Sequence, residues 1–208
     1  MDAGLITVGD ELLSGEVENS NATWLARRLA EQGVKLQEMR VVPDERDRIA
    51  EPVAGFATRF DVVVVTGGLG STPDDMTLEA VAGALDVPLE RNERALRDIE
   101  RAVAEIQDEY PEFTFDSEAA AQFPEGGEVV PNDVGIAPGC VLENVYVLPG
   151  LPEEMRATFE AVDDRFDGDR LRRSLYTQVP ESHLNRVLTE VTSEFEVSVG
   201  CYPQEECN

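Results

Sequence analysis

The chain has 208 residues, with 43 acidic and 17 basic side chains and a formal net charge of −26 at pH 7. This length suits a domain of about 150–170 residues with a small appendage. The negative field disfavours nucleic acid and anionic membranes, so we expect neither as a partner. No apolar run reaches about 18 residues and no basic stretch opens the chain, so we expect a cytoplasmic protein without a membrane span or signal peptide.

The acidic residues are spread along the whole chain rather than gathered in one tail. An even acidic surface is typical of adaptation to high salt, because such a surface stays hydrated while salt screens its self-repulsion. A partner with a basic surface is the alternative explanation. We expect a halophilic protein.

The sequence contains few cysteine and histidine residues that could act as catalysts or metal ligands. The cysteines are Cys140, Cys201 and Cys207, an odd number without a C-x-x-C pair, which argues against a disulfide framework and a structural zinc site. His183 is the single histidine, and it lies where a helix is predicted to begin. A mechanism of the Ser-His-Asp or Cys-His type would depend on that residue alone, so we do not expect one.

The first half of the chain alternates strands and helices. We expect strands at residues 3–8, 34–42 and 62–65, and helices at residues 22–32, 45–58 and 77–85. Asn19 or Asn21 can cap the first helix, and Gly33 ends it. Pro52 lies inside the second helix and predicts a kink or an early break there.

The second half begins with the longest helical pattern, residues 90–110. Its apolar side chains recur every three or four residues and its other faces are charged, as in a solvated helix packed on a core; a dimer-forming helix is the alternative. We then expect a short helix at residues 117–123, strands at residues 128–131, 140–142 and 145–148, and a helix at residues 153–162.

The C-terminal part differs in character. Residues 163–169 are acidic and polar, as in a linker. A strand at residues 171–179, a helix at residues 181–195 and a strand at residues 196–199 would form a small βαβ unit. The pattern therefore predicts a doubly wound, mostly parallel α/β domain at residues 1–166 and a small α/β appendage at residues 170–208.

A glycine-rich turn after the third strand carries the clearest functional signal. Four consecutive valines, apolar on both faces, run into Gly67, Gly68 and Gly70. A buried strand, a glycine turn and a helix N-terminus together can bind an anion, most often a phosphate. Asp74 and Asp75 lie just before the helix and would repel a phosphate unless a cation lay between. The turn therefore suggests a combined phosphate and metal site.

Other acidic loops follow the neighbouring strands. Asp10 and Glu11 come after the first strand, and Asp44 comes after the second. Because the carboxyl ends of parallel strands meet at one edge of a sheet, Asp10, Asp44 and the Asp74–Asp75 pair can converge there. The loops at residues 132–139 and 149–152 are further candidates for the same edge.

Five ordered motifs resemble a known family. They are GDELLSG at residues 9–15, Asn19 with Asn21, TGGLGSTPDDMT at residues 66–77, Asn132 with Gly135 and APG at residues 137–139, and LPGLP at residues 148–152. Together they resemble the N-terminal domain of the competence/damage-inducible protein A (CinA) family, which has the molybdopterin-binding, MoaB/Mog-like fold. The resemblance covers residues 3–166, and the tail is similar to the small subdomain that follows in that family.

The resemblance implies a three-layer α/β/α sandwich, a homo-oligomer, and a pocket for a phosphorylated pterin or nucleotide. It implies chemistry or metal binding at Asp44 and Asp75. From the convergence of the loops we also expect Asp10 as a metal ligand. A set of oxygen ligands favours Mg²⁺ or Mn²⁺. The expected ligand-binding residues are Gly9, Asp10, Glu11, Asn21, Thr66, Gly67, Gly68, Gly70, Thr72, Asp74, Thr77, Asn132, Gly135, Pro138, Gly139, Pro149 and Gly150.

Three functions are compatible with these residues. The first is metal-dependent hydrolysis of a dinucleotide pyrophosphate such as ADP-ribose or FAD. The second is molybdopterin binding with adenylyl transfer, and the third is a non-enzymatic binding module. Full-length bacterial members also carry a nicotinamide-mononucleotide amidohydrolase domain, which has no counterpart in these residues, so we expect no deamidation. The appendage also lacks the strands expected after residues 200–203.

Overall fold

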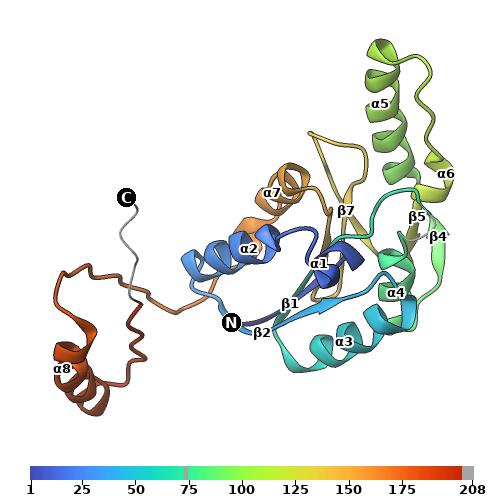
Figure 1. The fold of residues 1–208 in the computed structure, drawn as a ribbon. Helices are drawn as coiled ribbons and strands as arrows, with labels where there is room; N and C mark the ends of the chain where they lie inside the picture. Colours follow the sequence, from blue (N-terminus) through green and yellow to red (C-terminus); the bar gives the residue numbers. More distant parts are fainter. Residues whose placement is uncertain (73–74, 203–208) are drawn as a thin grey trace. The chain divides into compact units, whose positions relative to one another are not determined.

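The computed structural model describes residues 1–72 and 75–202 (Figure 1). The chain divides into two compact units, residues 1–172 and 173–208, and each is described by itself. In the described parts of the chain, no helix combines the length and apolar character needed to cross a membrane.

The first unit is built on a six-stranded sheet with the order β2-β1-β3-β8-β7-β6. These strands are β1 (Asp2–Val8), β2 (Lys35–Val42), β3 (Val62–Thr66), β6 (Glu128–Val130), β7 (Gly139–Leu142) and β8 (Val145–Leu148). β2, β1, β3 and β8 run parallel, whereas β7 and β6 pair antiparallel. Thr66 of β3 is level with Thr7 of β1 and Leu148 of β8, so these strands end at one edge. The predicted mostly parallel sheet is confirmed.

Helices cover both faces of this sheet, which makes three layers (Figure 1). α3 (Arg46–Arg59), α4 (Thr77–Ala84) and the buried side of α5 (Glu93–Glu109) share one hydrophobic cluster with Val63 and Val65 of β3. α2 (Ser20–Glu31) and α7 (Pro152–Glu160) share the other cluster with Val62 and Val64. Successive strand residues point to opposite faces, so the valine run is apolar throughout because both faces are covered.

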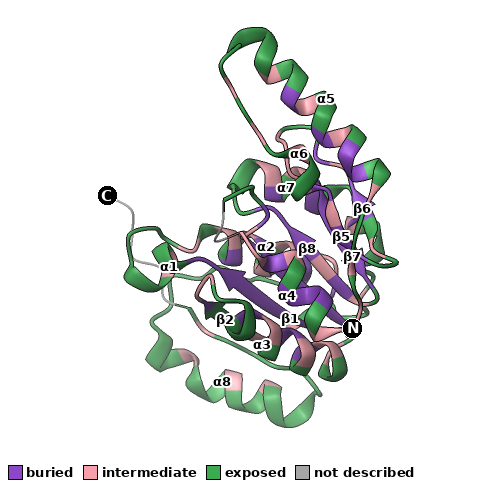
Figure 2. Ribbon diagram, turned by 90° about the vertical axis from the view of Figure 1, so that its right-hand side faces the viewer, coloured by how far each residue is buried: buried purple, intermediate pink, exposed green. Residues whose placement is uncertain are grey.

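A small two-stranded sheet lies beside α5 and was not predicted. β4 (Leu89–Arg91) pairs antiparallel with β5 (Gln122–Pro124), and the short α6 (Ser117–Ala120) precedes β5. Asn92 follows β4 and caps α5, because its Oδ1 accepts hydrogen bonds from the backbone N–H groups of Arg94 and Ala95 at 3.0 and 3.1 Å. α5 therefore begins three residues later than predicted. Figure 2 shows that its far end is largely exposed.

Pro52 does not break its helix. α3 continues to Arg59, seven residues beyond the proline. Pro52 is itself buried, and Val53 and Phe56 after it are buried in the core. Burial of this apolar side of the helix offsets the lost backbone hydrogen bond, so the predicted early break is wrong.

In residues 173–202 the second unit contains one helix, α8 (Glu181–Glu194), which matches the prediction. The strands predicted at residues 171–179 and 196–199 are not formed in the described part of this unit. A strand needs a hydrogen-bonded neighbour, and no described segment pairs with either stretch. The remaining short elements of the chain are α1 (Asp10–Ser14) and the 3₁₀ helix η1 (Asp163–Arg165).

Candidate functional site

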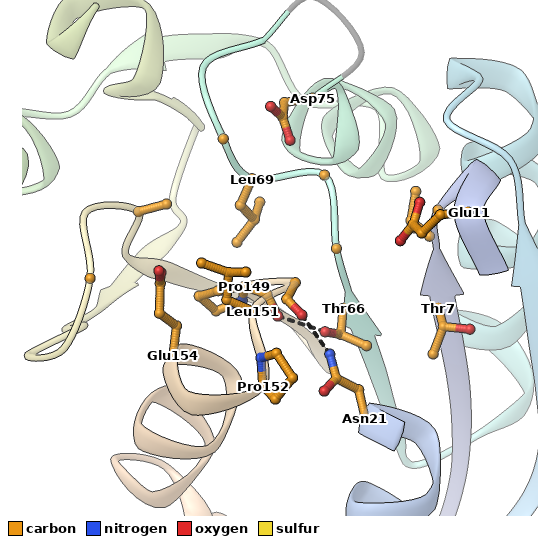
Figure 3. Close-up of a pocket in the computed structure, with 18 of the residues that line it drawn as sticks. Thr7, Glu11, Asn21, Thr66, Leu69, Asp75, Pro149, Leu151, Pro152 and Glu154 are labelled. Atoms are coloured by element: carbon orange, nitrogen blue, oxygen red, sulfur yellow. Dashed lines mark hydrogen bonds between the residues drawn. The ribbon is translucent and has the colours of Figure 1, made fainter. Parts of the chain in front are cut away.

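A cavity of about 700 Å³ opens at the carboxyl ends of β1, β3 and β8 (Figure 3). The loops that follow these three strands supply most of its lining, and Ile106 of α5 and Phe115 reach it from elsewhere in the chain. Ligand sites of open α/β sheets form at this edge, and the volume is typical of a small-molecule pocket. We take this cavity as the candidate site.

The turn after β3 can be made only with glycine at two positions. Gly67 has φ +107° and Gly68 has φ +64°, a region that other residues rarely adopt. A Cβ on Gly67 would overlap the carbonyl oxygen of Val8, and one on Gly68 would overlap the hydroxyl of Thr77. The turn is therefore packed tightly between β1 and the start of α4.

The backbone N–H groups of this turn differ in their hydrogen bonding. Gly67 uses its N–H to bind the carbonyl oxygen of Leu148 at 3.1 Å. The N–H groups of Gly68, Leu69 and Gly70 make no hydrogen bond with any other described residue, although all three residues line the cavity. Successive unpaired N–H groups in such a turn form an anion-binding concavity.

Two threonines tie the turn to its neighbours. The Thr66 hydroxyl donates to the carbonyl oxygen of Pro149 at 2.7 Å, and the Thr77 hydroxyl donates to that of Gly67 at 2.8 Å. Both side chains are buried. Thr66 lines the cavity whereas Thr77 does not, so the hydroxyl of Thr77 serves the shape of the turn.

Two carboxylates lie on the wall formed by these loops. Asp75 Oδ2 accepts hydrogen bonds from the backbone N–H of Thr72, at 2.9 Å, and from the Thr72 hydroxyl. Asp44 Oδ2 accepts one from the backbone N–H of Asp10, at 2.9 Å. Each carboxylate is thus held by a neighbouring loop and still lines the cavity. The side chain of Asp10 is not among the lining residues, but that of Glu11 is.

Asn21 joins the first turn of α2 to the loop after β8. Its Nδ2 donates to the carbonyl oxygen of Gly150 at 2.7 Å, a contact drawn in Figure 3. Its Oδ1 is buried and has no hydrogen-bond partner among the described residues. Asn19, the other predicted cap, accepts the N–H of Ala22 at 3.1 Å and so performs the capping itself.

Glu154 also lines the cavity, and sequence reasoning missed it. It lies in the first turn of α7, and its Oε2 accepts a hydrogen bond from Asn132 Nδ2 at 2.7 Å. Burial raises the pKa of this carboxyl above its usual value, and the hydrogen bond from Asn132 partly opposes that shift. In the sequence it resembles an ordinary acidic residue of a helix first turn, which is why its position gave no signal.

The predicted ligand-binding set divides in two. The predicted residues that line the cavity are Gly9, Glu11, Asn21, Asp44, Thr66, Gly67, Gly68, Gly70, Asp75, Gly135, Pro149 and Gly150. Those outside the lining are Asp10, Thr72, Thr77, Asn132, Pro138 and Gly139. Several of the second group support the first, as Thr72 supports Asp75. Asp74 lies outside the described residues.

The charged groups of the cavity have one sign. Its described lining includes the carboxylates of Glu11, Glu18, Asp44, Asp75 and Glu154, and no lysine, arginine or histidine. No cluster of three or more potential metal-binding side chains occurs in residues 1–72 and 75–202. Asp44 and Asp75 are the two predicted metal ligands that line the cavity. Mg²⁺ is commonly bound by one or two carboxylates together with waters and substrate phosphates.

A family model described as a probable molybdopterin binding domain matches residues 4–166. A CinA-like protein of Frankia casuarinae is 41% identical over 172 residues, which cover 77% of this chain and 39% of that protein. A protein of Archaeoglobus fulgidus is 35% identical over 209 residues, covering 98% of this chain and 86% of the relative. The chain spans about half the length, or less, of the CinA-like relatives that it matches.

Solved structures agree with these sequence matches. The CinA protein of Thermoplasma acidophilum, a protein of unknown function, superimposes with a TM-score of 0.72 at 32% identity, over 80% of this chain and 99% of its own. The molybdopterin biosynthesis enzyme MoaB of Thermus thermophilus has a TM-score of 0.50 at 20% identity, over 82% of this chain and 99% of its own, and shares the fold. The chain therefore belongs to the molybdopterin-binding domain family and is CinA-like.

Proposed function

We propose that the cavity binds a phosphorylated pterin or nucleotide and hydrolyses a dinucleotide pyrophosphate of the ADP-ribose or FAD type with the help of a divalent cation. The main support is the composition of the cavity wall. The lining includes Gly68, Leu69 and Gly70, whose N–H groups have no hydrogen-bond partner among the described residues, and its described side chains include carboxylates and no basic group. A diphosphate in such a site needs a cation to balance the carboxylate charge.

In this proposal the glycine turn and the two carboxylates have different roles. The N–H groups of the turn bind phosphate oxygens, and because the turn is rigid they need little reorganisation as negative charge develops. Thr72 holds Asp75 and the N–H of Asp10 holds Asp44, so both carboxylates are oriented before a ligand arrives. Asp44 and Asp75 would hold a Mg²⁺ or Mn²⁺ ion, which would supply charge neutralisation and a water of lowered pKa.

The test is release of AMP from ADP-ribose or FAD, with and without Mg²⁺, in molar KCl. We expect metal-dependent release by the wild type, and a loss of at least about a hundredfold in Asp75→Ala, which removes a ligand of the cation that would stabilise charge on the reacting phosphate. Glu153→Gln is the control, because Glu153 is exposed and lies outside the cavity. Wild type without metal-dependent release, or Asp75→Ala with full activity, contradicts the proposal.

Molybdopterin handling is the second candidate, supported by the description of the matching family. The turn would then bind the pterin phosphate, with adenylyl transfer from ATP as a further step. Calorimetry with molybdopterin and with ADP-ribose separates the two functions. Nanomolar pterin binding without nucleotide hydrolysis favours the second, and binding of either ligand with neither hydrolysis nor adenylyl transfer indicates a binding module.

A further inference from the structure

Glu154 is a fixed carboxyl group with unused hydrogen-bonding capacity. It makes no ion pair with any described residue, and among these residues only Asn132 donates a hydrogen bond to it, at Oε2. Asn132 Nδ2 also donates to the carbonyl oxygen of Ala137 at 2.9 Å. Both amide hydrogens of Asn132 are therefore used, one on Ala137 and one on Glu154 Oε2. Glu154 Oε1 has no donor among the described residues, so it can accept a hydrogen bond from a ligand.

The missing side chain of Gly135 leaves the space that the Glu154 carboxyl group occupies. A Cβ on Gly135 would overlap the carboxyl atoms of Glu154, so the group lies directly against the backbone of the loop before β7. Asn132 on the same loop donates to it, and α7 carries it from the other side. Orientation by two elements is what a specific polar contact requires.

The surroundings of Glu154 suit a flat ring. The loop before β7 and the loop after β8 line the cavity beside Glu154. Their lining side chains are apolar: Val134, Ile136, Pro149 and Leu151. Figure 3 shows Pro149 and Leu151 beside Glu154, with Glu11 on the far side of the cavity and Asp75 near the glycine turn. A pocket with apolar walls and one oriented polar group is typical of recognition of a heteroaromatic ring.

The sheet order places this subsite away from the acidic loops of β1 and β2. β8 carries the loop that leads to Glu154, β3 carries the glycine turn, and β1 lies on the other side of β3. A carboxylate repels phosphate and attracts N–H donors. A ligand whose phosphate occupies the turn would therefore direct its ring, and not a second phosphate, toward Glu154.

We propose that Glu154 accepts a hydrogen bond from an exocyclic amino group on the ligand's ring and so selects amino-substituted rings over their oxo analogues. This inference rests on the proposed phosphate-binding function. The amino group could belong to the adenine of ADP-ribose or FAD, or to a pterin. An oxo group at the same place would put two hydrogen-bond acceptors against each other and give Glu154 Oε1 no donor from the ligand. Because burial favours the neutral form, a donor from the ligand also relieves the cost of the ionised form.

The experiment compares amino and oxo ligands by calorimetry with Mg²⁺ in molar KCl. One pair is the non-hydrolysable α,β-methylene analogue of ADP-ribose and its hypoxanthine counterpart, and the other is 6-hydroxymethylpterin monophosphate and the corresponding lumazine. We expect the wild type to bind the amino member of at least one pair roughly 10- to 100-fold more tightly, the range for a hydrogen bond to a charged group. The pair that shows the preference identifies the ring.

Glu154→Gln should reduce that preference to severalfold or less, and Glu153→Gln should retain it, since both glutamates lie in the first turn of α7 but only Glu154 lines the cavity. Equal thermal midpoints establish that both variants are folded. If the ligands bind well but with equal affinity, or if Glu154→Gln keeps the full preference, this inference is wrong while the proposed function stands. If neither pair binds at all, both are wrong.

Discussion

At the scale of single residues, the site depends on positions that tolerate no side chain. Gly67 and Gly68 have positive φ, and each lies against an atom of a neighbouring element. Around them, Thr66, Thr77 and Thr72 use their side chains to hold loops and carboxylates. The chemistry therefore rests on backbone N–H groups and two carboxylates, whose positions are set by residues that need not contact the ligand themselves.

Gly67→Ala tests this directly. The new Cβ would be strained at φ +107° and would overlap the carbonyl oxygen of Val8, so we expect a loss of about 1–3 kcal/mol in the free energy of unfolding. Gly55→Ala is the matched control, because Gly55 lies within α3 with open space around its Cα, and alanine there should stabilise by about 0.5–1 kcal/mol. Urea unfolding at constant salt measures both. Equal effects of the two substitutions would contradict the strained turn.

At the scale of elements, four parallel strands bring separate loops together. The loops after β1, β3 and β8 line the cavity, and Asp44 joins them from the loop after β2. This convergence could be predicted, because valine-rich strands indicate a parallel sheet and a parallel sheet aligns its carboxyl ends. Register and packing then decide which member of each loop reaches the cavity, as with Glu11 rather than Asp10.

Other features depend on contacts between distant residues and were not predictable. The pairing of β4 with β5 joins segments about thirty residues apart, and it shortens two predicted helices. Glu154 has the sequence context of an acidic helix start, and only the loop that carries Asn132 and Gly135 makes it a cavity residue. The tail patterns at residues 171–179 and 196–199 favour strands locally, but a strand also needs a partner, which local sequence does not supply.

The antiparallel strand β7 offers a probe of how firmly the sheet is held. Cys140 of β7 is fully buried, and burial raises the pKa of its thiol to about 12. The reactive thiolate is therefore scarce at pH 8 and the sulfur is inaccessible, so we expect Cys140 to resist iodoacetamide in the native protein while Cys201, which is less buried, reacts. Peptide mass spectrometry follows each site, with urea-unfolded protein as the control. Native labelling of Cys140 at the unfolded rate would mean that this part of the sheet opens readily.

At the scale of the whole molecule, charge dominates. The net charge of −26 belongs to a chain of only 208 residues, and the cavity shares its sign. Repulsion among the carboxylates opposes the compact state, and the same field disfavours an anionic ligand. Added salt should therefore increase both the stability of the fold and the affinity for an anionic ligand. A bound divalent cation should mainly increase ligand affinity at the cavity.

We propose that the fold is adapted to high salt, and this gives a simple expectation. The thermal midpoint should rise when KCl is increased from about 0.05 M to 2 M, because the Debye length falls to roughly 3 Å near 1 M and repulsion is screened. KCl is the right salt for this test, since sulfate would strengthen apolar burial whatever the charge. An unchanged or lower midpoint in KCl would show that self-repulsion does not limit stability.

The cation dependence of ligand affinity tests the central claim most directly. The non-hydrolysable α,β-methylene analogue of ADP-ribose, or molybdopterin if that proves to be the ligand, is titrated by calorimetry at fixed high KCl, with Mg²⁺ and then with EDTA. We predict binding with Mg²⁺, a loss of affinity of at least tenfold with EDTA, and the same weak affinity for Asp75→Ala under both conditions. Tight binding in EDTA that Asp75→Ala leaves unchanged would contradict a phosphate site bridged by a cation at the glycine turn.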